Sequence, residues 1–343
     1  MARLSIAEAL REGLREEMTR DERVFCIGED IAIPGGWGGA FTVTLGLEKD
    51  FRDRMIDTPI SEAGFFGAAL GTAIMGMRPV ADVQYSDFLF CAMDQIVSQI
   101  ATMRYMSGCK ITVPIVMRAP VGATGRGAQH AHNPEAIFYG IPGMKIICPA
   151  TAYDAKGMLK AAIRDDNPVL MFEHKLLYGS KGARAESGTV DASSEIPDED
   201  YIVPIGKGII RREGTDVTII ANLLMMHFAQ LAAEQLAAEG ISAEVIDPRT
   251  LIPFDWELVE NSVMKTRCAV IVEEGPRTGG IGADLAATLS ERMCDYLVAP
   301  VARVASPDIP VPFSPPMENF YRPDVERIVA AAKRVVEGVS VLS

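Results

Sequence analysis

The chain alternates short apolar runs with longer segments of helical periodicity, and this alternation limits the fold more than any other feature. Strands that are separated by helices run parallel, because a helical crossover returns the chain to the same end of the sheet. The pattern therefore predicts an α/β protein whose doubly wound sheets carry helices on both faces. A chain of 343 residues is too long for one ordinary core. We expect two domains.

The first set of alternating segments fills the N-terminal half. Strands are expected at 24–30, 56–59, 79–85, 113–120, 145–150 and 168–174. Helices are expected at 62–76, 87–106 and 153–164, and another runs to about Thr19 after Ser5, which can cap it. From Gly179 to Asp200 the composition shifts to small, polar and charged residues, which is typical of a linker. The expected division is a first domain at 1–178, a linker at 179–200 and a second domain at 201–343.

The second half repeats the pattern. Strands are expected at 216–222, 243–248, 268–275 and 301–305, and helices at 226–239, 255–265, 281–293 and 323–336. A proline-rich segment that begins at Pro307 is predicted to run extended over the surface.

Charge and composition exclude several classes of function. The net charge of −13 disfavours non-specific binding to nucleic acid and would attract a basic protein partner. No apolar run reaches the ~18 residues that a membrane span needs. The N-terminal helix carries charges of both signs and lacks the apolar core of a secretory signal, so we expect a cytoplasmic protein. Six cysteines without a CxxC pair favour reduced thiols over a metal site.

One acid, Glu62, begins the helix expected at 62–76, directly after Ser61, which could cap it. The helix dipole favours an acid in this position, and that alone accounts for many such residues. The alternative is a catalytic carboxyl group. Small side chains follow it and would let another helix approach closely. These are Ala63, Gly64, Gly67, Ala68, Gly71 and Thr72.

Two histidines lie in the glycine-rich loop GRGAQHAHNPEA, which follows an expected strand. Loops at the carboxyl ends of parallel strands form the ligand sites of open sheets, so His130 is a candidate for proton transfer. A histidine on a polar surface loop is the alternative. Zinc would need further ligands, and only Glu135 stands at a suitable spacing from His130 and His132.

Two other patterns are weaker. Phe88, at an expected helix start, could stack on a flat ring or simply belong to the core. The stretch EEGPRTGGIG, from Glu273 to Gly282, leads from a strand to a helix and favours an anion, but it lacks the GxGxxG spacing.

Several motifs together point to one family. IDTPISEAGF, GAQH, AIRDDNPV, VIDPRTLIPFD and IVEEG follow one another in this order. With them the chain resembles, from Leu4 to about Val336, the beta subunit of the thiamine-diphosphate-dependent 2-oxo acid dehydrogenases, which include the pyruvate, branched-chain and acetoin enzymes. The resemblance implies a pyrimidine-binding domain for the cofactor, followed by a transketolase C-terminal-like domain.

The family works as a heterotetramer of two alpha and two beta chains. Its alpha chain holds the diphosphate and magnesium through a GDG motif, and this sequence contains no GDG. The resemblance therefore implies half of an active site, which an alpha subunit completes. It also implies decarboxylation of a 2-oxo acid, or cleavage of acetoin, and transfer of the acyl group to a lipoyl-bearing acyltransferase core.

The resemblance assigns roles to individual residues. Glu62 would hydrogen-bond the ring nitrogen of the cofactor's aminopyrimidine, Phe88 would lie against its face and Gln84 would line the same pocket. His130 would orient the substrate or the lipoyl group and shuttle protons. Many relatives read QHSQ where this chain reads QHAH, so Ala131 removes a hydroxyl and His132 adds a second titratable ring. The preferred substrate stays open.

Family members also hold a potassium ion with backbone carbonyl groups. The matching positions here are Ile115, Ala162, Asp165 and Asn167. Carbonyl ligands leave little trace in a sequence, so this assignment depends on the resemblance alone.

Two other functions stay in view. A transketolase-like enzyme that acts on sugar phosphates would need basic side chains at its pocket, and Arg118 and Arg126 are the candidates. A non-enzymatic subunit would use its acidic C-terminal domain only to dock a basic partner domain. Replacement of Glu62 would then leave the activity of the complex unchanged.

Overall fold

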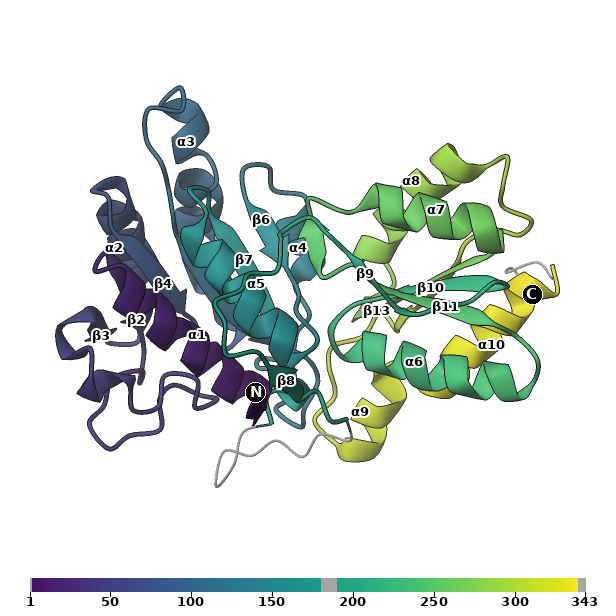
Figure 1. Ribbon diagram of the computed structural model, residues 1–343, viewed down its shortest axis with the longest axis horizontal. Coiled ribbons are helices and arrows are strands. Elements are labelled where there is room, and N and C mark those ends of the chain that lie inside the picture. The colour runs from purple at the N-terminus through teal and green to yellow at the C-terminus, as the bar shows by residue number, and fades with distance from the viewer. Residues whose placement is uncertain (1, 180–189, 339–343) are drawn as a thin grey trace. The chain divides into compact units, whose positions relative to one another are not determined.

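The computed structural model describes residues 2–179 and 190–338, and they form two compact units (Figure 1). The first unit comprises Met1–Val121 and Tyr139–Ile205, and the second comprises Gly122–Phe138 and Gly206–Ser343. The loop at 122–138 is therefore inserted in the sequence of the first unit but belongs to the second. The domain limits and the linker stay predictions, and the linker's residues 180–189 lie outside the described residues.

The strands of the first unit form a parallel sheet with the order β6-β7-β5-β4-β2-β3. Its parallel pairing confirms the α/β pattern read from the sequence. The strands are β2 (Val24–Gly28), β3 (Met55–Asp57), β4 (Arg78–Asp82), β5 (Val116–Val121), β6 (Lys145–Ile147) and β7 (Val169–His174). A short antiparallel pair, β1 (Ala2–Leu4) with β8 (Ser194–Ile196), was not expected from the sequence.

Two helices of the first unit, α1 (Ile6–Arg20) and α5 (Ala152–Arg164), lie side by side (Figure 1). Ser5 begins α1 with a capping box: its hydroxyl accepts the Glu8 N–H at 3.3 Å, and its own N–H donates to the Glu8 carboxylate at 2.9 Å. Lys156 of α5 is buried against α1, where Glu16 lies 2.6 Å from its Nζ. The predicted helices thus form where caps and periodicity placed them.

The prediction of a single α-helix at 87–106 is wrong. The chain instead forms a 3-10 helix at Ser86–Ala92, a π-helix at Asp94–Ile100 and the short α3 (Met103–Met106). In the 3-10 segment Ser86, Leu89 and Ala92 are buried, and this three-residue spacing suits a helix with three residues per turn. The Ala101 N–H donates to the Ile96 carbonyl five residues earlier, as in a π-helix.

A buried charge network joins three neighbouring strands of the first unit. Arg118 on β5 is 2% exposed and donates from Nε and Nη2 to the two carboxylate oxygens of Glu173 on β7, at 2.8 and 2.7 Å. Its Nη1 donates to Asp82 on β4. The Tyr178 hydroxyl completes the network with a 2.6 Å bond to Glu173. Burial, and then the Glu173 charge, raises the pKa of Tyr178.

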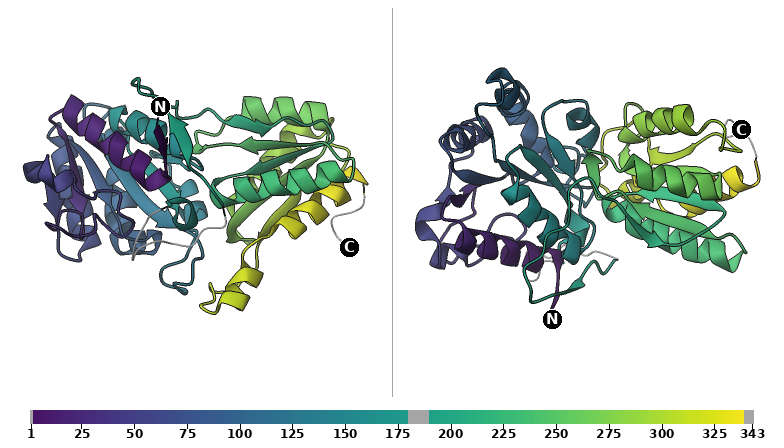
Figure 2. Two further views of the ribbon diagram at one scale, coloured as in Figure 1. Left: turned by 60° about the horizontal axis from the view of Figure 1, so that its bottom comes forward. Right: turned by 45° about the horizontal axis from the view of Figure 1, so that its top comes forward.

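The second unit has a sheet of order β14-β13-β10-β11-β9, parallel except for β9. Helices cover both of its faces (Figure 2). The strands are β9 (Ile209–Arg212), β10 (Val217–Ala221), β11 (Ala243–Asp247), β13 (Ala269–Pro276) and β14 (Ala302–Ser306). The helices include α6 (Leu223–Ala238), α7 (Trp256–Thr266), α8 (Ile281–Met293) and α10 (Val325–Val336). The antiparallel β9 and the short β12 (Thr250–Ile252) were not predicted.

The order of connections creates a switch point in the second unit. From β10 the chain passes through α6 to β11 on one side of β10. It then passes through α7 to β13, which pairs with the other side of β10. The loops that leave β10 and β13 therefore diverge at the carboxyl ends of these two strands, which is where open α/β sheets form crevices.

The loop at 122–138 is attached to the second unit by hydrogen bonds from its backbone. The Ala123 N–H donates to Glu274 at 2.8 Å, and its carbonyl accepts from Arg322 at 2.8 Å. The Gly125 N–H donates to Glu318 at 2.6 Å. These contacts hold the loop in the second unit, together with Glu135 at the start of the short α4 (Glu135–Tyr139).

We expected the proline-rich segment to be extended throughout, but the structure shows that it is not. It contains α9 (Pro315–Tyr321), whose first two residues are prolines. Proline is tolerated there because the first N–H groups of a helix have no partner within it. Among the described helices, none is both long and apolar enough to cross a membrane.

Replacing Arg118 by Met should lower the free energy of unfolding by roughly 3–5 kcal/mol, because Glu173 would remain buried without its cation. Urea unfolding measures the change. The matched control is Arg3→Met, which removes the exposed pair with Asp191 and should cost about 0–1 kcal/mol. Equal losses in the two variants would contradict a structural role for the buried network.

Candidate functional site

Polar side chains gather where neighbouring strands of the first unit end. Glu29 follows β2, Asp57 ends β3 and Gln84 lies just beyond β4, and these three strands are adjacent and parallel. Their carboxyl ends therefore meet at one edge of the sheet. The Gln84 Nε2 lies 3.4 Å from the Glu29 carbonyl and 3.3 Å from the Asp30 carboxylate. The Asp57 carboxylate accepts the Ile31 N–H at 2.8 Å.

Glu62 stands at the same edge as the first residue of α2 (Glu62–Ile74) and is 9% exposed. Ser61 makes no side-chain capping bond to this helix. Within residues 2–179 and 190–338, no hydrogen bond to the Glu62 carboxyl group is found. Burial raises the pKa of Glu29, and the charges of Asp30, Glu62 and Asp57 raise it further. Glu62 is thus a nearly buried acid, close to other acids and without a protein donor.

A row of aromatic rings positions Phe88. Its ring meets Tyr85 edge to face at 5.7 Å between centroids, and Tyr85 meets Phe41 in the same way at 5.8 Å. Phe41 in turn stacks on Tyr178 at 4.8 Å. Because Tyr178 is bonded to Glu173, the half-buried Phe88 ring is connected through packed groups to the buried arginine network.

His130 belongs to the second unit and is half-buried, and its N–H donates to the Gly127 carbonyl at 3.2 Å. The intervening Ala131 is 1% exposed and packs with Ala123, Val311 and Tyr321. A hydroxyl at position 131 would enter this apolar cluster, which gives a packing reason for the QHAH sequence. Structure thus brings Gln84, Phe88 and Glu62 into the first unit and His130 into the second.

The predicted potassium ligands lie around the end of α5. The Ile115 carbonyl accepts the Val169 N–H at 2.9 Å, and the Ala162 carbonyl accepts the Asp165 N–H at 3.2 Å. The Asn167 N–H and amide both donate to the Asp165 carboxylate, at 2.9 and 2.8 Å. A carbonyl oxygen has two lone pairs, so the bonds at Ile115 and Ala162 each leave a second acceptor position.

Arg78 also approaches this helix end. Its Nη1 donates to the carbonyls of Ile163 and Asp165, at 2.9 and 3.0 Å. The carboxyl end of α5 therefore already attracts one cation, as expected from the helix dipole.

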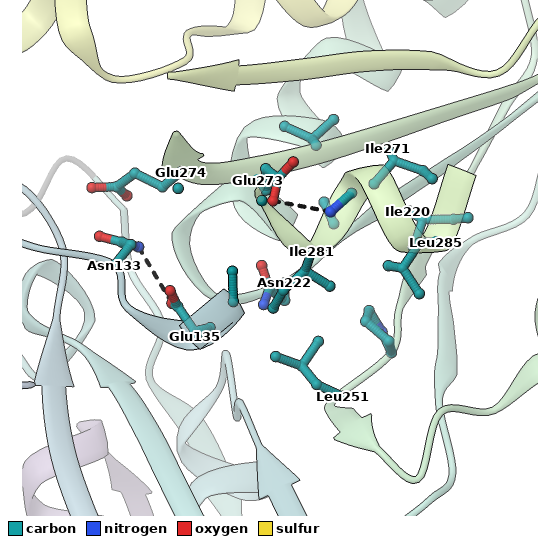
Figure 3. A pocket seen from close by; sticks show the side chains of 17 residues that line it. Asn133, Glu135, Ile220, Asn222, Leu251, Ile271, Glu273, Glu274, Ile281 and Leu285 are labelled. Carbon is teal, nitrogen blue, oxygen red and sulfur yellow. Dashed lines mark hydrogen bonds between the residues drawn. The ribbon is translucent and has the colours of Figure 1, made fainter. Parts of the chain in front are cut away.

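A cavity of about 40 Å³ lies in the second unit at the carboxyl ends of β10 and β13 (Figure 3). Glu135, at the start of α4, lines it and is 6% exposed. Burial raises the pKa of Glu135 to about 8, and the charges of Glu274 and Glu273 add to the effect. Asn133 Nδ2 lies 3.4 Å from the Glu135 carboxyl group.

Glu273 also lines the cavity, and its bonds account for the anion-favouring character of the EEGPRTGGIG stretch. Its carboxylate accepts the Gly282 N–H at 3.0 Å in the first turn of α8 and pairs with Arg303 at 3.0 Å. The turn does favour an anion, as predicted, but the chain's own carboxylate occupies the helix start. Burial raises the pKa of Glu273 despite these partners.

Comparison with protein families gives two matches along the chain. Residues 2–181 match the transketolase pyrimidine-binding domain, and residues 206–328 match the transketolase C-terminal domain. A solved chain described as a split-gene transketolase, in an inactive beta4 tetramer, superposes with a TM-score of 0.77 at 26% identity. The superposition covers 98% of this chain and 99% of that one.

Curated relatives resemble the chain over nearly its whole length. The beta subunit of 2-oxoisovalerate dehydrogenase from Bacillus subtilis is 43% identical, over 98% of this chain and all of the relative. The beta subunit of acetoin:2,6-dichlorophenolindophenol oxidoreductase from Cupriavidus necator is 43% identical, over 98% and 99%. The mitochondrial beta subunit of the pyruvate dehydrogenase E1 component from Dictyostelium discoideum is 44% identical, over 97% and 91%.

The chain belongs to the beta-subunit family of the thiamine-diphosphate-dependent 2-oxo acid dehydrogenases. This membership confirms the resemblance and the fold class predicted from the sequence, and it makes the beta subunit a component of an oxidoreductase. The roles of Glu62, Gln84, Phe88 and His130 stay predictions.

Sequence reasoning missed other polar residues of this beta subunit. Glu29 and Asp57 could have been found from their places at the ends of adjacent strands. Glu135 had been considered only as a zinc ligand, and Glu273 only as part of a turn. Their common signal is an acid at or just beyond a strand end, or at a helix start. The burial of Glu135 depends in addition on the distant contacts of the loop at 122–138.

Replacing Glu135 by Gln should change how stability depends on pH. The pKa of Glu135 is about 8 in the folded chain, whereas an ordinary Glu in the unfolded chain has a pKa of about 4.5. The folded chain therefore binds this proton more tightly. Stability is therefore full below pH 4.5 and falls, by up to about 5 kcal/mol, as pH rises to about 8. In the Gln variant, the free energy of unfolding should not show this fall between about pH 4.5 and about pH 8.

Urea unfolding at about pH 5 and about pH 8 measures the difference between variant and parent. Glu234→Gln is the matched control, because it removes an exposed carboxylate from α6 of the same unit. Parallel pH profiles for the Glu135 variant and the parent would show that Glu135 titrates normally.

Proposed function

We propose that the chain is the beta subunit of a 2-oxo acid or acetoin dehydrogenase that works with an alpha subunit in an alpha2-beta2 heterotetramer. The complex would decarboxylate a 2-oxo acid, or cleave acetoin, and pass the acyl group to a lipoyl-bearing acyltransferase core. Relatives named for 2-oxoisovalerate, acetoin and pyruvate are 43–44% identical, so identity favours none of the three substrates.

The observation that carries this proposal is the environment of Glu62. A nearly buried carboxyl group without a protein donor suits a ligand nitrogen that shares a proton with it. Bound thiamine diphosphate supplies an electron sink when a bond next to a carbonyl carbon is broken. Glu62 would hold the proton at the ring nitrogen of the aminopyrimidine, Phe88 would pack on the ring face and Gln84 would line the ring's pocket.

The second half of the site would come from an alpha chain. We place the diphosphate and magnesium on that partner, because this sequence has no GDG motif. The outer face of α2 supports a partner at this place: Ala63, Gly64, Ala68 and Gly71 are exposed, and Ile60 just before the helix is 77% exposed. Small side chains let a second helix approach closely, and exposed apolar ones favour being covered.

His130 would act from the second unit's loop. We propose that its half-buried imidazole orients the substrate or the lipoyl group and moves a proton during acyl transfer. Ala131 holds the loop through its buried methyl group, while His132 provides a second ring two residues away.

We also propose that potassium binds through the carbonyls of Ile115, Ala162, Asp165 and Asn167. Hard cations prefer oxygen ligands, and the negative end of α5 lies at this place. A cytoplasmic location belongs to the same proposal. All six cysteines lie in the described residues and none forms a disulfide there, and three are exposed, which suits a reducing compartment.

The geometry weakens the sugar-phosphate alternative. Arg118, one of the two basic candidates for a phosphate, is buried and bonded to Glu173 and Asp82. Moving it to a phosphate would leave these carboxylates unpaired in the core. Arg126 is exposed on its loop and would have to act without Arg118.

Replacing Glu62 by Gln should lower the turnover of the reconstituted complex by about 10²- to 10⁴-fold, because the amide cannot exchange a proton with the ring nitrogen. The assay uses the chain with its alpha partner and lipoyl acyltransferase, on whichever of pyruvate, branched-chain 2-oxo acids and acetoin is turned over. Size-exclusion chromatography should show unchanged assembly.

The control variant is Glu22→Gln, which removes an exposed acid of the same unit and should leave turnover unchanged. Full activity of the Glu62 variant in an intact assembly would contradict the proposal. It would favour the non-enzymatic alternative, in which the acidic second unit only docks a basic partner domain.

A further inference from the structure

The cavity of the second unit stands at the switch point of its sheet. Ala221 and Asn222 line it where β10 passes into α6, and Val272 to Gly275 line it where β13 ends. These two strands are neighbours whose connections leave in opposite directions. In open α/β sheets this is the place where ligands bind. All the lining residues, including those of the loop at 122–138, belong to the second unit.

The lining is acidic on one side and aliphatic on the other. Figure 3 shows Glu135, Asn133 and Glu274 on one side of the cavity, and Ile220, Ile271 and Leu285 on the opposite side. Among the described residues that line it, none is Lys, Arg or His. A ligand that fits this division has a positive end and an apolar end.

The acids at the cavity differ in how well they are satisfied. Glu273 has Arg303 and the Gly282 N–H, and Glu274 accepts the Ala123 N–H. Glu135 is only 6% exposed. Its carboxyl group accepts hydrogen bonds from the Asn133 amide, at 3.4 Å, and from its own backbone N–H. A weakly bonded buried acid can gain more from a charged partner than a well-bonded one.

We propose that this cavity binds a short alkylammonium group, with the ammonium against Glu135 and the carbon chain along Ile220, Ile271 and Leu285. The size limits the ligand. About 40 Å³ holds roughly three to four water-sized groups, at about 10–15 Å³ each. A primary amine with two or three carbon atoms, or the end of a longer amine, has this size. The site is separate from Glu62 and needs no cofactor.

Binding is coupled to loss of the Glu135 proton, because an ammonium ion pairs with the ionised carboxylate. The charged or titratable groups that act on Glu135 are Glu273 and Glu274 on β13 and Tyr321 on α9. Below pH 8, ligand and proton compete, so affinity rises with pH by up to about tenfold per unit and levels off above about pH 8. Each bound ligand releases up to one proton.

The test uses the full-length chain and propylammonium chloride as the probe, with 1-propanol and sodium propionate as matched neutral and anionic probes. Isothermal titration at about pH 8.5 and about pH 6.5, in two buffers of different ionisation enthalpy, gives affinity and proton release. We expect saturable binding of propylammonium that is tighter at the higher pH, and much weaker binding of the other two probes.

Variants assign the binding to this cavity. Glu135→Gln should weaken propylammonium binding at about pH 8.5 by at least about tenfold, and so should Ala136→Met, which adds bulk at the cavity wall. Glu234→Gln, on the exposed face of α6, should bind like the parent. Melting temperatures confirm that each variant is folded.

Three results would overturn the proposal: no saturable binding of propylammonium by the parent, equal binding of 1-propanol, or unchanged binding by folded Glu135→Gln. None of them would bear on the role of Glu62, because no cofactor or partner chain takes part in the measurement.

Discussion

The bidentate pairing of Arg118 with Glu173 is the interaction on which the geometry of the first unit depends. It ties β5 to β7, and through Asp82 it also ties β4 at the same edge. Removing one partner of such a buried pair is strongly destabilising, so the three strands are held in one arrangement. Tyr178, Phe41 and Tyr85 extend this rigidity to Phe88. The proposed ring-binding face is thus supported from the core.

The same rule of topology places polar groups in both units. Parallel strands bring their carboxyl ends to one edge, where the acids of the first unit gather around Glu62 and those of the second gather around the cavity. Their chemistry differs with their surroundings. Glu273 is bonded by a helix start and by Arg303, whereas Glu62 has no donor among the described residues. We propose ligands for the nearly buried acids with the weakest bonding, Glu62 without a described donor and Glu135 with only the Asn133 amide at 3.4 Å and its own backbone N–H.

The sequence predicted what local rules decide. Helical periodicity after a possible cap, Ser5, located α1, and the apolar runs located the parallel strands. It failed where distant contacts decide: the burial of Ser86, Leu89 and Ala92 turns an expected α-helix into a 3-10 helix. The burial of Glu135 likewise depends on Ala123 meeting Glu274 and Arg322, which no local pattern shows. Glu62 was found as a helix-start acid, but only the family resemblance gave it a ligand.

The central claim is that this chain carries the acid of a cofactor site whose diphosphate end lies on another chain. Calorimetric titration of thiamine diphosphate with magnesium, into the isolated chain and into the chain mixed with a GDG-bearing alpha subunit, tests it directly. The account predicts no measurable binding to the isolated chain and saturable binding to the mixture. Tight binding by the isolated chain would contradict it.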